Sequence, residues 1–371
     1  MSENIYRICS RCVMDTHDLD ISFDSVGQCN LCTEYLERTI NNVYKGKESD
    51  AQLDLMIEKV KKAGKGKNYD CIVGVSGGVD SMYLTYLTVK WGLRPLAVHM
   101  DNGWNASMAE SNIKNTLDKL KIDLYTEVLN RNEFIDLQLS FLKASVPEAE
   151  NPTDMAIQGV LHKVARKYRI KYILSGGNYA TEGILPKSFQ YNAKDLRYLK
   201  AIHKRFGTVK LKTFPAFGFR HEFVYKLFYG IKILYPLNYV PYDKDKACNI
   251  LKNEFGWEYY GGKHHESVYT KFIQTYWLPK KFNIDYRKAT FSTLICAGDL
   301  SRENALELLK TKPWDEKNIE EDIEFVAKKL NISAKELITL INTNPKRYWN
   351  YPNAKKSLEL GYSIYRIINK K

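Results

Sequence analysis

Two hydrophobic patterns alternate along the central part of the chain. Continuous apolar runs, which are typical of strands buried on both faces, occur at 69–75, 94–100, 124–128 and 172–174. Apolar residues recur at helical spacing over 82–91, 107–120 and 154–168. Unbroken apolar strands that alternate with helices predict an α/β fold with a doubly wound parallel sheet. Ligands of such sheets bind at the carboxyl ends of the strands.

The remaining segments have other patterns. Helical spacing predicts a helix over 51–63, and from residue 243 onward it predicts helices at 246–255, 301–309, 319–330 and 334–340. The last of these has a capping box, because Glu336 follows Ser333 at the required distance. The segment 183–235 is irregular, basic and aromatic, which indicates an insertion or lid. Within it, the apolar stretch 217–237 is interrupted by basic residues, so we expect a packed amphipathic helix there.

These patterns divide the chain into four parts. The expected parts are a four-cysteine module over 1–45, a connecting helix over 46–68, an α/β domain over 69–245 with the insertion at 183–235, and a mainly helical C-terminal region over 246–371. Of the 371 residues, 44% are hydrophobic and 27% are charged, which is the balance of a folded protein and excludes extensive disorder. No run approaches the ~20 apolar residues that span a bilayer, and Met1–Asn4 lacks the features of a secretion signal. We therefore expect a cytoplasmic protein without membrane insertion.

The positive charge of the chain is concentrated in one segment. The whole chain has 56 Lys and Arg against 43 Asp and Glu, a net charge of +13. Residues 160–235 contain 16 Lys and Arg against three acidic residues, so this segment accounts for the whole excess. A basic segment interleaved with Tyr and Phe fits a polyanionic ligand, a nucleic acid or an anionic membrane surface. Composition does not choose among them.

Four of the seven cysteines form a metal-binding pattern. Cys9 and Cys12 make one C-x2-C pair, and after sixteen residues Cys29 and Cys32 make a second. Two such pairs complete a tetrahedral four-thiolate site, which has no open position and is therefore structural. Zinc is the first choice, although an iron–sulfur cluster or a single iron uses the same ligands. Disulfides are disfavoured in a reducing compartment.

The other three cysteines, Cys71, Cys248 and Cys296, are isolated in the sequence. For Cys71, which begins an apolar run, and for Cys296, which follows Thr-Leu-Ile, packing in the core is the favoured interpretation.

The hexamer Ser-Gly-Gly-Val-Asp-Ser at 76–81 lies between a predicted strand and a predicted helix. Its two glycines allow a phosphate to approach the backbone, and the helix that follows offers unpaired N–H groups. The spacing does not match the Walker A or the G-x-G-x-x-G motif. Beside a polyphosphate Asp80 needs a cation, so it is a candidate Mg²⁺ ligand. A simple turn that opens a helix is the alternative.

This hexamer resembles the pyrophosphate loop of the ATP-pyrophosphatase superfamily, which includes GMP, NAD and asparagine synthetases and tRNA thiolases. The resemblance implies a HUP-like fold and cleavage of ATP between its α and β phosphates, so that a carbonyl oxygen is adenylated and ammonia or a sulfur donor displaces AMP. The ATP-binding residues that it implies are Val75, Ser76, Gly77, Gly78, Asp80, Ser81, His99, Asp101, Asn102, Ser175, Gly176, Gly177 and Asn178.

Within this superfamily the chain is similar to the N-acetyl sugar amidotransferases of bacterial surface-polysaccharide and flagellin-glycan assembly. The similarity is carried by the zinc-ribbon-like cysteine module, the motif at 98–104, the motif at 174–178 with Glu182, and the motif at 256–267. It implies that an acetamido group of a nucleotide-activated sugar becomes an acetamidino group through an adenylated imidate and ammonia.

We assign roles to the motif residues as a hypothesis. Asp80 would act with Mg²⁺ at the pyrophosphate, and Lys263, His264 and His265 would lie near the α-phosphate or the sugar nucleotide. Glu266 or Glu182 would orient these groups or relay a proton from ammonia. Arg287 and Lys288 either bind a phosphate or are surface charges.

Two expectations concern partners. The chain has no glutaminase-like cysteine nucleophile, so a separate glutaminase subunit is expected to supply ammonia. The main alternative is a tRNA thiolase, whose basic aromatic segment would bind phosphates and stack bases. Against it, the paired cysteines lie far from the loop, so tRNA is the second choice and a binding module without catalysis fits less well.

Overall fold

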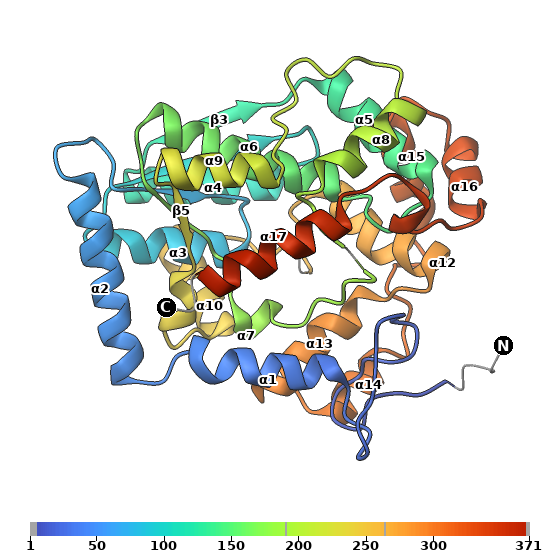
Figure 1. The fold of residues 1–371 in the computed structure, drawn as a ribbon, viewed down its shortest axis with the longest axis horizontal. Coiled ribbons are helices and arrows are strands. Elements are labelled where there is room, and N and C mark those ends of the chain that lie inside the picture. Colours follow the sequence, from blue (N-terminus) through green and yellow to red (C-terminus); the bar gives the residue numbers. More distant parts are fainter. Residues whose placement is uncertain (1–5, 190, 263–264, 369–371) are drawn as a thin grey trace.

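A parallel sheet of five strands lies at the centre of the protein. The computed structural model describes residues 6–189, 191–262 and 265–368 (Figure 1). The strands are β1 (Cys71–Gly74), β2 (Pro95–Asp101), β3 (Leu124–Val128), β4 (Tyr172–Leu174) and β5 (Lys232–Leu234). They are ordered β3-β2-β1-β4-β5, and every neighbouring pair is parallel. The predicted α/β class is therefore confirmed.

Strand order places a crevice between β1 and β4. The chain adds β2 and β3 on one side of β1, then returns to add β4 and β5 on the other side. The connections after β1 and after β4 run to opposite sides of the sheet, which leaves a gap at the carboxyl ends of these two strands. Doubly wound sheets bind their ligands in such a gap. The motifs at 76–81 and 174–178 begin at those strand ends.

Helices cover both faces of the sheet. The helices of this part are α2 (Lys47–Gly64), α3 (Val79–Lys90), α4 (Ser107–Leu120), α5 (Arg131–Ala144) and α6 (Asn151–Lys167). Side chains in β1 alternate between the two faces. Val73 packs with residues of α2, α3, α4 and α10 (Lys244–Phe255), whereas Ile72 packs with Val160 and Val164 of α6. All of these side chains are buried, so the sheet has a hydrophobic core on each side.

The basic segment forms helices and the last strand. After the end of α6 and β4, the basic segment 160–235 contains α7 (Tyr179–Glu182), α8 (Leu196–Phe206), α9 (Phe219–Phe228) and β5. β5 lies inside the range 183–235 that the pattern assigned to an insertion. The amphipathic helix expected within 217–237 forms as α9, and it packs through the half-buried Tyr225, which contacts the rings of His162 and Phe217, although none of its own residues is fully buried. Among the described residues no helix is both long and apolar enough to cross a bilayer.

The C-terminal region is helical, as predicted. After α10 it contains α11 (Val268–Phe272), α12 (Leu278–Phe282), α13 (Tyr286–Ala297), α14 (Arg302–Leu308), α15 (Ile319–Lys329), α16 (Ala334–Asn342) and α17 (Lys355–Ile368), with the short elements η1 (Pro236–Tyr239), η2 (Ile273–Trp277) and η3 (Tyr348–Asn350). The predicted capping box of α16 forms, with the Glu336 N–H donating to Ser333 Oγ at 3.2 Å.

The N-terminal cysteine module packs against this C-terminal region (Figure 1). Its helix α1 (Asn30–Asn42) contacts α13, and the Arg302 side chain donates to the carbonyl oxygens of Cys9 and Cys12. The Lys288 ammonium also pairs with the buried carboxylate of Asp15. Residues separated by nearly 300 positions in the sequence therefore form one hydrophobic cluster.

Candidate functional site

The predicted phosphate loop closes on itself between β1 and α3. Ser81 Oγ donates to the Gly78 carbonyl at 3.0 Å and accepts from the Ser76 N–H at 3.3 Å. Gly77 has a φ of +85°, and a Cβ atom there would lie 2.5 Å from the Ala109 carbonyl oxygen. Both the backbone conformation and the close approach of α4 therefore require glycine. The loop leads directly into the N-terminus of α3, where unpaired N–H groups favour an anion.

Three aromatic residues from beyond the sheet hold this loop. The Trp257 indole N–H donates to the Gly77 carbonyl at 2.9 Å, and Trp257 is buried. The Tyr242 hydroxyl donates to Asp80 Oδ1. Tyr260 lies over Gly78, since a Cβ atom at Gly78 would be 3.0 Å from its hydroxyl. Trp257 and Tyr260 belong to the sequence motif at 256–267, whereas no sequence signal pointed to Tyr242.

The ends of β2 and β4 bring further motif residues to the loop. His99 Nδ1 lies 2.9 Å from the Val75 carbonyl oxygen, and its Nε2 lies 2.9 Å from the Asn105 side-chain amide, so contacts on both nitrogens fix the orientation of the ring. Gly176 packs against the start of α3, because a Cβ atom there would lie 2.9 Å from the Asp80 backbone. The loops that follow β1, β2 and β4 therefore meet at one place.

The side chains of two predicted ATP-binding residues form hydrogen bonds with the backbone of turns and line neither of the two cavities beside the loop. Asp101 Oδ1 accepts the Gly103 N–H at 2.8 Å. Asn178 is the N-cap of α7, where its side chain accepts the Thr181 N–H at 2.9 Å. Each side chain shapes a loop that carries other motif residues.

Two cavities open beside the loop and share part of their walls. The larger has a volume of about 540 Å³, and the predicted residues that line it are Val75, Ser76, His99, Asn102, Ser175, Gly176, Glu182 and Glu266. The smaller has a volume of about 160 Å³, and its predicted lining residues are Ser76, Gly78, Asp80, Ser81, Gly176, Gly177, Glu182 and Glu266. The smaller cavity thus adjoins the first turn of α3. Residues common to both linings, including Glu182 and Glu266, lie at the junction.

Glu266 reaches this junction because two distant segments pair. Asn105 and Ser267 form an antiparallel bridge, the Ala106 N–H donates to the Glu266 carbonyl at 2.9 Å, and the Val268 N–H donates to the Trp104 carbonyl at 3.0 Å. The loop after β2 therefore carries the beginning of the C-terminal helices to the cavity. A motif near residue 100 and another near residue 266 become neighbours in this way.

The large cavity is rich in carboxyl groups. Its lining includes Glu148, Glu150 and Asp154 besides Glu182 and Glu266. Burial raises the pKa of Glu148, which accepts the Tyr198 hydroxyl at 3.0 Å, to about 7. Burial and the neighbouring Asp154 raise the pKa of Glu150 to about 8. One oxygen of Glu150 accepts the Thr270 hydroxyl at 2.6 Å, while the other has no hydrogen-bond partner among the described residues. No motif in the sequence pointed to Glu148, Glu150 or Asp154.

The other predicted catalytic residues are only partly placed. Lys263 and His264 lie outside the described residues. The His265 ring packs on Gly262, where a Cβ atom would lie 2.4 Å from it. Arg287 forms an ion pair with Asp285 at 2.7 Å and donates to the Thr311 carbonyl. Like Lys288, which pairs with Asp15, it therefore has a structural role, and phosphate binding by either residue is disfavoured.

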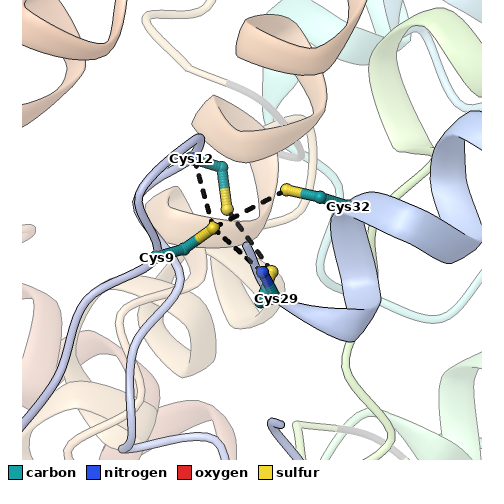
Figure 2. Close-up of side chains that lie close together, drawn as sticks. All are labelled: Cys9, Cys12, Cys29 and Cys32. Carbon is teal, nitrogen blue, oxygen red and sulfur yellow. Dashed lines mark hydrogen bonds between the residues drawn. The ribbon is translucent and has the colours of Figure 1, made fainter. Parts of the chain in front are cut away.

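The four predicted metal ligands converge at a second site (Figure 2). Their side chains are fully buried, and the Sγ–Sγ separation is 3.9 Å for Cys9 and Cys32 and 3.8 Å for Cys12 and Cys29. Thiolates at 2.3 Å from one tetrahedral ion lie about 3.8 Å apart, so these separations fit a single ion. In a four-iron cluster each thiolate binds its own iron, which holds the ligands further apart.

A fifth cysteine lies beside this site. Cys296 Sγ is 3.6 Å from Cys32 Sγ, and Cys296 is half-buried. The interpretation of Cys296 as an isolated packing residue is therefore incomplete. Its neighbour is 264 positions away in the sequence, and the Cys296 sequence context contains no second cysteine that would have indicated it.

The chain is similar in sequence to two curated proteins. A probable mitochondrial tRNA-specific 2-thiouridylase 1 of Caenorhabditis elegans is 31% identical over 140 residues, covering 33% of this chain and 36% of that protein. The uncharacterized protein MJ1599 of Methanocaldococcus jannaschii is 30% identical over 170 residues, covering 40% of this chain and 58% of that protein. The chain thus spans about a third to three fifths of the length of these relatives.

Two solved structures align with much of the chain at low identity. NMN synthetase from Francisella tularensis is 15% identical with a TM-score of 0.31, covering 60% of this chain and 96% of that one. NH3-dependent NAD synthetase from Campylobacter jejuni is 14% identical with a TM-score of 0.34, covering 70% and 93%.

A family match covers the C-terminal helices. Residues 266–365 match the model described as "LPS biosynthesis protein WbpG-like, C-terminal domain". The match begins at Glu266, the residue that the paired segments bring to the cavity. This match bears out, for residues 266–365, the resemblance that the motifs indicated.

Proposed function

We propose that the protein is an ATP-dependent amidotransferase that converts an acetamido group of a nucleotide-activated sugar to an acetamidino group, releasing AMP and pyrophosphate. One observation carries the proposal. The phosphate loop opens into a cavity whose other wall is formed by the WbpG-like domain and by buried carboxyl groups. A nucleotide and a second substrate would therefore meet at Glu182 and Glu266.

The reaction begins with activation of the amide. An acetamide carbon is a poor electrophile, but adenylation of its oxygen creates an imidate with AMP as the leaving group. The Ser76–Ser81 loop and the N-terminus of α3 bind the β and γ phosphates and orient the α-phosphate toward the large cavity. Asp80 would hold a Mg²⁺ ion there, which offsets negative charge on the pyrophosphate when bound.

The carboxyl groups suit the second step. Ammonia adds to the imidate carbon and the C–O bond to AMP breaks, which leaves a positively charged amidinium group. Carboxylates in a partly enclosed cavity stabilise the positive charge that develops in this step. Glu266, at the junction of the two cavities, is placed to accept a proton from the attacking nitrogen.

The four-cysteine site would have a structural role. We propose that it binds one zinc ion, because the sulfur separations fit a single tetrahedral ion and four thiolates leave no open position. The ion would hold the N-terminal module in the shape that packs against α13 and accepts the Arg302 hydrogen bonds, and it would thereby support the C-terminal helices that line the cavity.

Ammonia would come from a separate glutaminase subunit. Cys248 interacts electrostatically with Asp80 of the phosphate loop, and burial raises the pKa of its thiol above the usual value. A raised pKa disfavours the thiolate that a glutaminase nucleophile requires.

A tRNA thiolase is the second candidate, favoured by the similarity to the curated thiouridylase. The same raised pKa of Cys248 argues against a sulfur-transferring thiolate at this position.

One experiment separates the two candidates. The protein is incubated with ATP, Mg²⁺, ammonium and a panel of diacetamido nucleotide sugars, and AMP is measured together with the mass of the sugar product. We expect AMP and a product in which NH replaces one amide oxygen, and the Asp80→Asn variant should form neither. AMP that forms with tRNA and with none of the sugars would contradict the proposal.

A further inference from the structure

The helix α9 exposes large apolar side chains to solvent. Three apolar side chains on its outer side are strongly exposed, with exposed fractions of 54% for Phe223, 61% for Leu227 and 77% for Phe228. The charged residues Glu222 and Lys226 lie on the half-buried side of the helix, where Glu222 accepts the Lys194 ammonium at 2.7 Å. Tyr225 packs against the core from the half-buried side. A typical surface helix keeps its other large apolar residues on that side too and exposes polar residues, so the outer side of α9 is unusual.

The exposed apolar residues form one continuous face. At 100° per residue Phe223, Leu227, Val224 and Phe228 follow one another around one side of the helix. Tyr229 continues this surface just after the helix. We call these five residues the α9 face. Contiguous apolar surface of this kind marks an interaction site, whereas single exposed apolar residues do not.

Basic side chains border the α9 face. Arg220 is exposed on α9 itself, the Arg166 guanidinium lies 4.7 Å from the centre of the Tyr229 ring, and Lys232 is exposed at the start of β5. They belong to the segment that holds the whole net charge of +13. Two copies of the chain joined through this face would bring like charges together, so the charge favours an anionic occupant.

The kind of occupant follows from the combination of groups. A single helix that presents Phe, Leu and Tyr outward, bordered by Arg and Lys, has the composition of helices that lie in the interface of a bilayer. Aromatic and aliphatic side chains enter the headgroup boundary, while basic side chains contact lipid phosphates. We propose that the α9 face binds the surface of an anionic lipid bilayer, as a peripheral contact that crosses no membrane.

The proposal goes beyond the reaction and needs no substrate for its test. The full chain is sedimented with vesicles of phosphatidylcholine that contain about one third phosphatidylglycerol, and with vesicles of phosphatidylcholine alone. We expect binding to the anionic vesicles that weakens at high salt. The Phe223→Ser/Phe228→Ser variant should bind them about tenfold less tightly or worse, because it loses the largest apolar side chains of the face.

A matched variant controls for loss of apolar surface elsewhere. Leu308→Ser/Trp349→Ser replaces residues that are exposed by 50% and 65% outside the α9 face, and it should bind vesicles like the unsubstituted protein. All four positions are exposed, so the circular dichroism spectrum and Tm should change little. Equal binding of both variants would overturn the proposal. Failure of the unsubstituted protein to bind anionic vesicles would also overturn it. In that case, dissociation of a dimer or release of an acidic protein partner by the α9 substitutions would identify the face as a protein interface.

Discussion

The Trp257 indole nitrogen lies 2.9 Å from the Gly77 carbonyl oxygen and donates a hydrogen bond to it. This bond joins the phosphate loop, near residue 77, to the segment that leads into the WbpG-like domain. Trp257 is buried in the same hydrophobic cluster as Val75 and Val79, which flank the loop, so its ring also packs next to the loop. The position of the phosphate loop therefore depends on a residue that precedes the C-terminal helices.

Removing this hydrogen bond should loosen the phosphate loop. In Trp257→Phe the Gly77 carbonyl loses its buried donor, which costs about 1–3 kcal/mol when the acceptor finds no other partner. We expect a lower Tm and a KM for ATP that rises several-fold, measured by AMP formation. Trp349→Phe, at an exposed position, should change neither quantity. An unchanged KM in Trp257→Phe would show that the bond does not position the loop.

A side chain at Gly77 should abolish nucleotide binding. Gly77→Ala meets the Ala109 carbonyl oxygen at 2.5 Å and also forces a positive φ on alanine. Gly46→Ala has comparable backbone strain, with a φ of +70°, but no atom within 4 Å of the new Cβ. Binding of an ATP analogue, measured by calorimetry, should therefore fall at least about tenfold in Gly77→Ala and stay unchanged in Gly46→Ala. Similar losses in both variants would mean that strain, and not the contact with α4, is responsible.

The metal of the four-cysteine site can be tested with the fifth cysteine as control. We expect about one zinc per chain by elemental analysis, and its loss in Cys32→Ser together with a fall in Tm of about 10 °C or more. Cys296→Ser removes a thiol 3.6 Å from Cys32 but leaves the four ligands, so it should keep the zinc. Iron and labile sulfide in place of zinc would contradict the single-ion assignment.

Stability should depend on pH through Glu150. Its pKa of about 8 in the folded protein lies above the ordinary value of 4.5, so between these values the folded protein holds a proton that the unfolded chain has lost. The free energy of unfolding therefore falls as pH rises from 4.5 to about 8, and the loss then levels off.

Glu150→Gln cannot ionise, so its Tm should fall less over this window than the Tm of the unsubstituted protein. Glu148, with its pKa of about 7, lowers the Tm of both proteins to the same extent as pH rises. Glu307→Gln, which removes a surface carboxylate, should retain the full pH dependence. Parallel Tm curves for Glu150→Gln and the unsubstituted protein would show that Glu150 is ionised in the folded state.

Sequence pattern predicted the elements whose residues interact locally. β1 and β2 were predicted from continuous apolar runs, and the helices that follow them were predicted from apolar residues at helical spacing. The Ser76–Ser81 loop was identified because strand, glycines and helix are contiguous. β5 was missed because it has three residues within a basic segment, and its place in the sheet depends on pairing with β4. A helix within 217–237 was predicted because basic residues interrupt the apolar stretch, but that pattern did not show that Phe223, Leu227 and Phe228 of α9 would be exposed.

The sequence by itself determined the parallel α/β class, the phosphate loop and the four metal ligands, because each depends on spacing within a short stretch. Only the tertiary structure brought Glu266 beside the loop, Trp257 beneath Gly77 and Cys296 beside Cys32. The same holds for the buried carboxyl groups of the cavity, because both the burial and the carboxyl neighbours that raise the pKa of Glu150 arise only on folding. Contacts across hundreds of residues depend on how helices pack, and no local pattern specifies that packing.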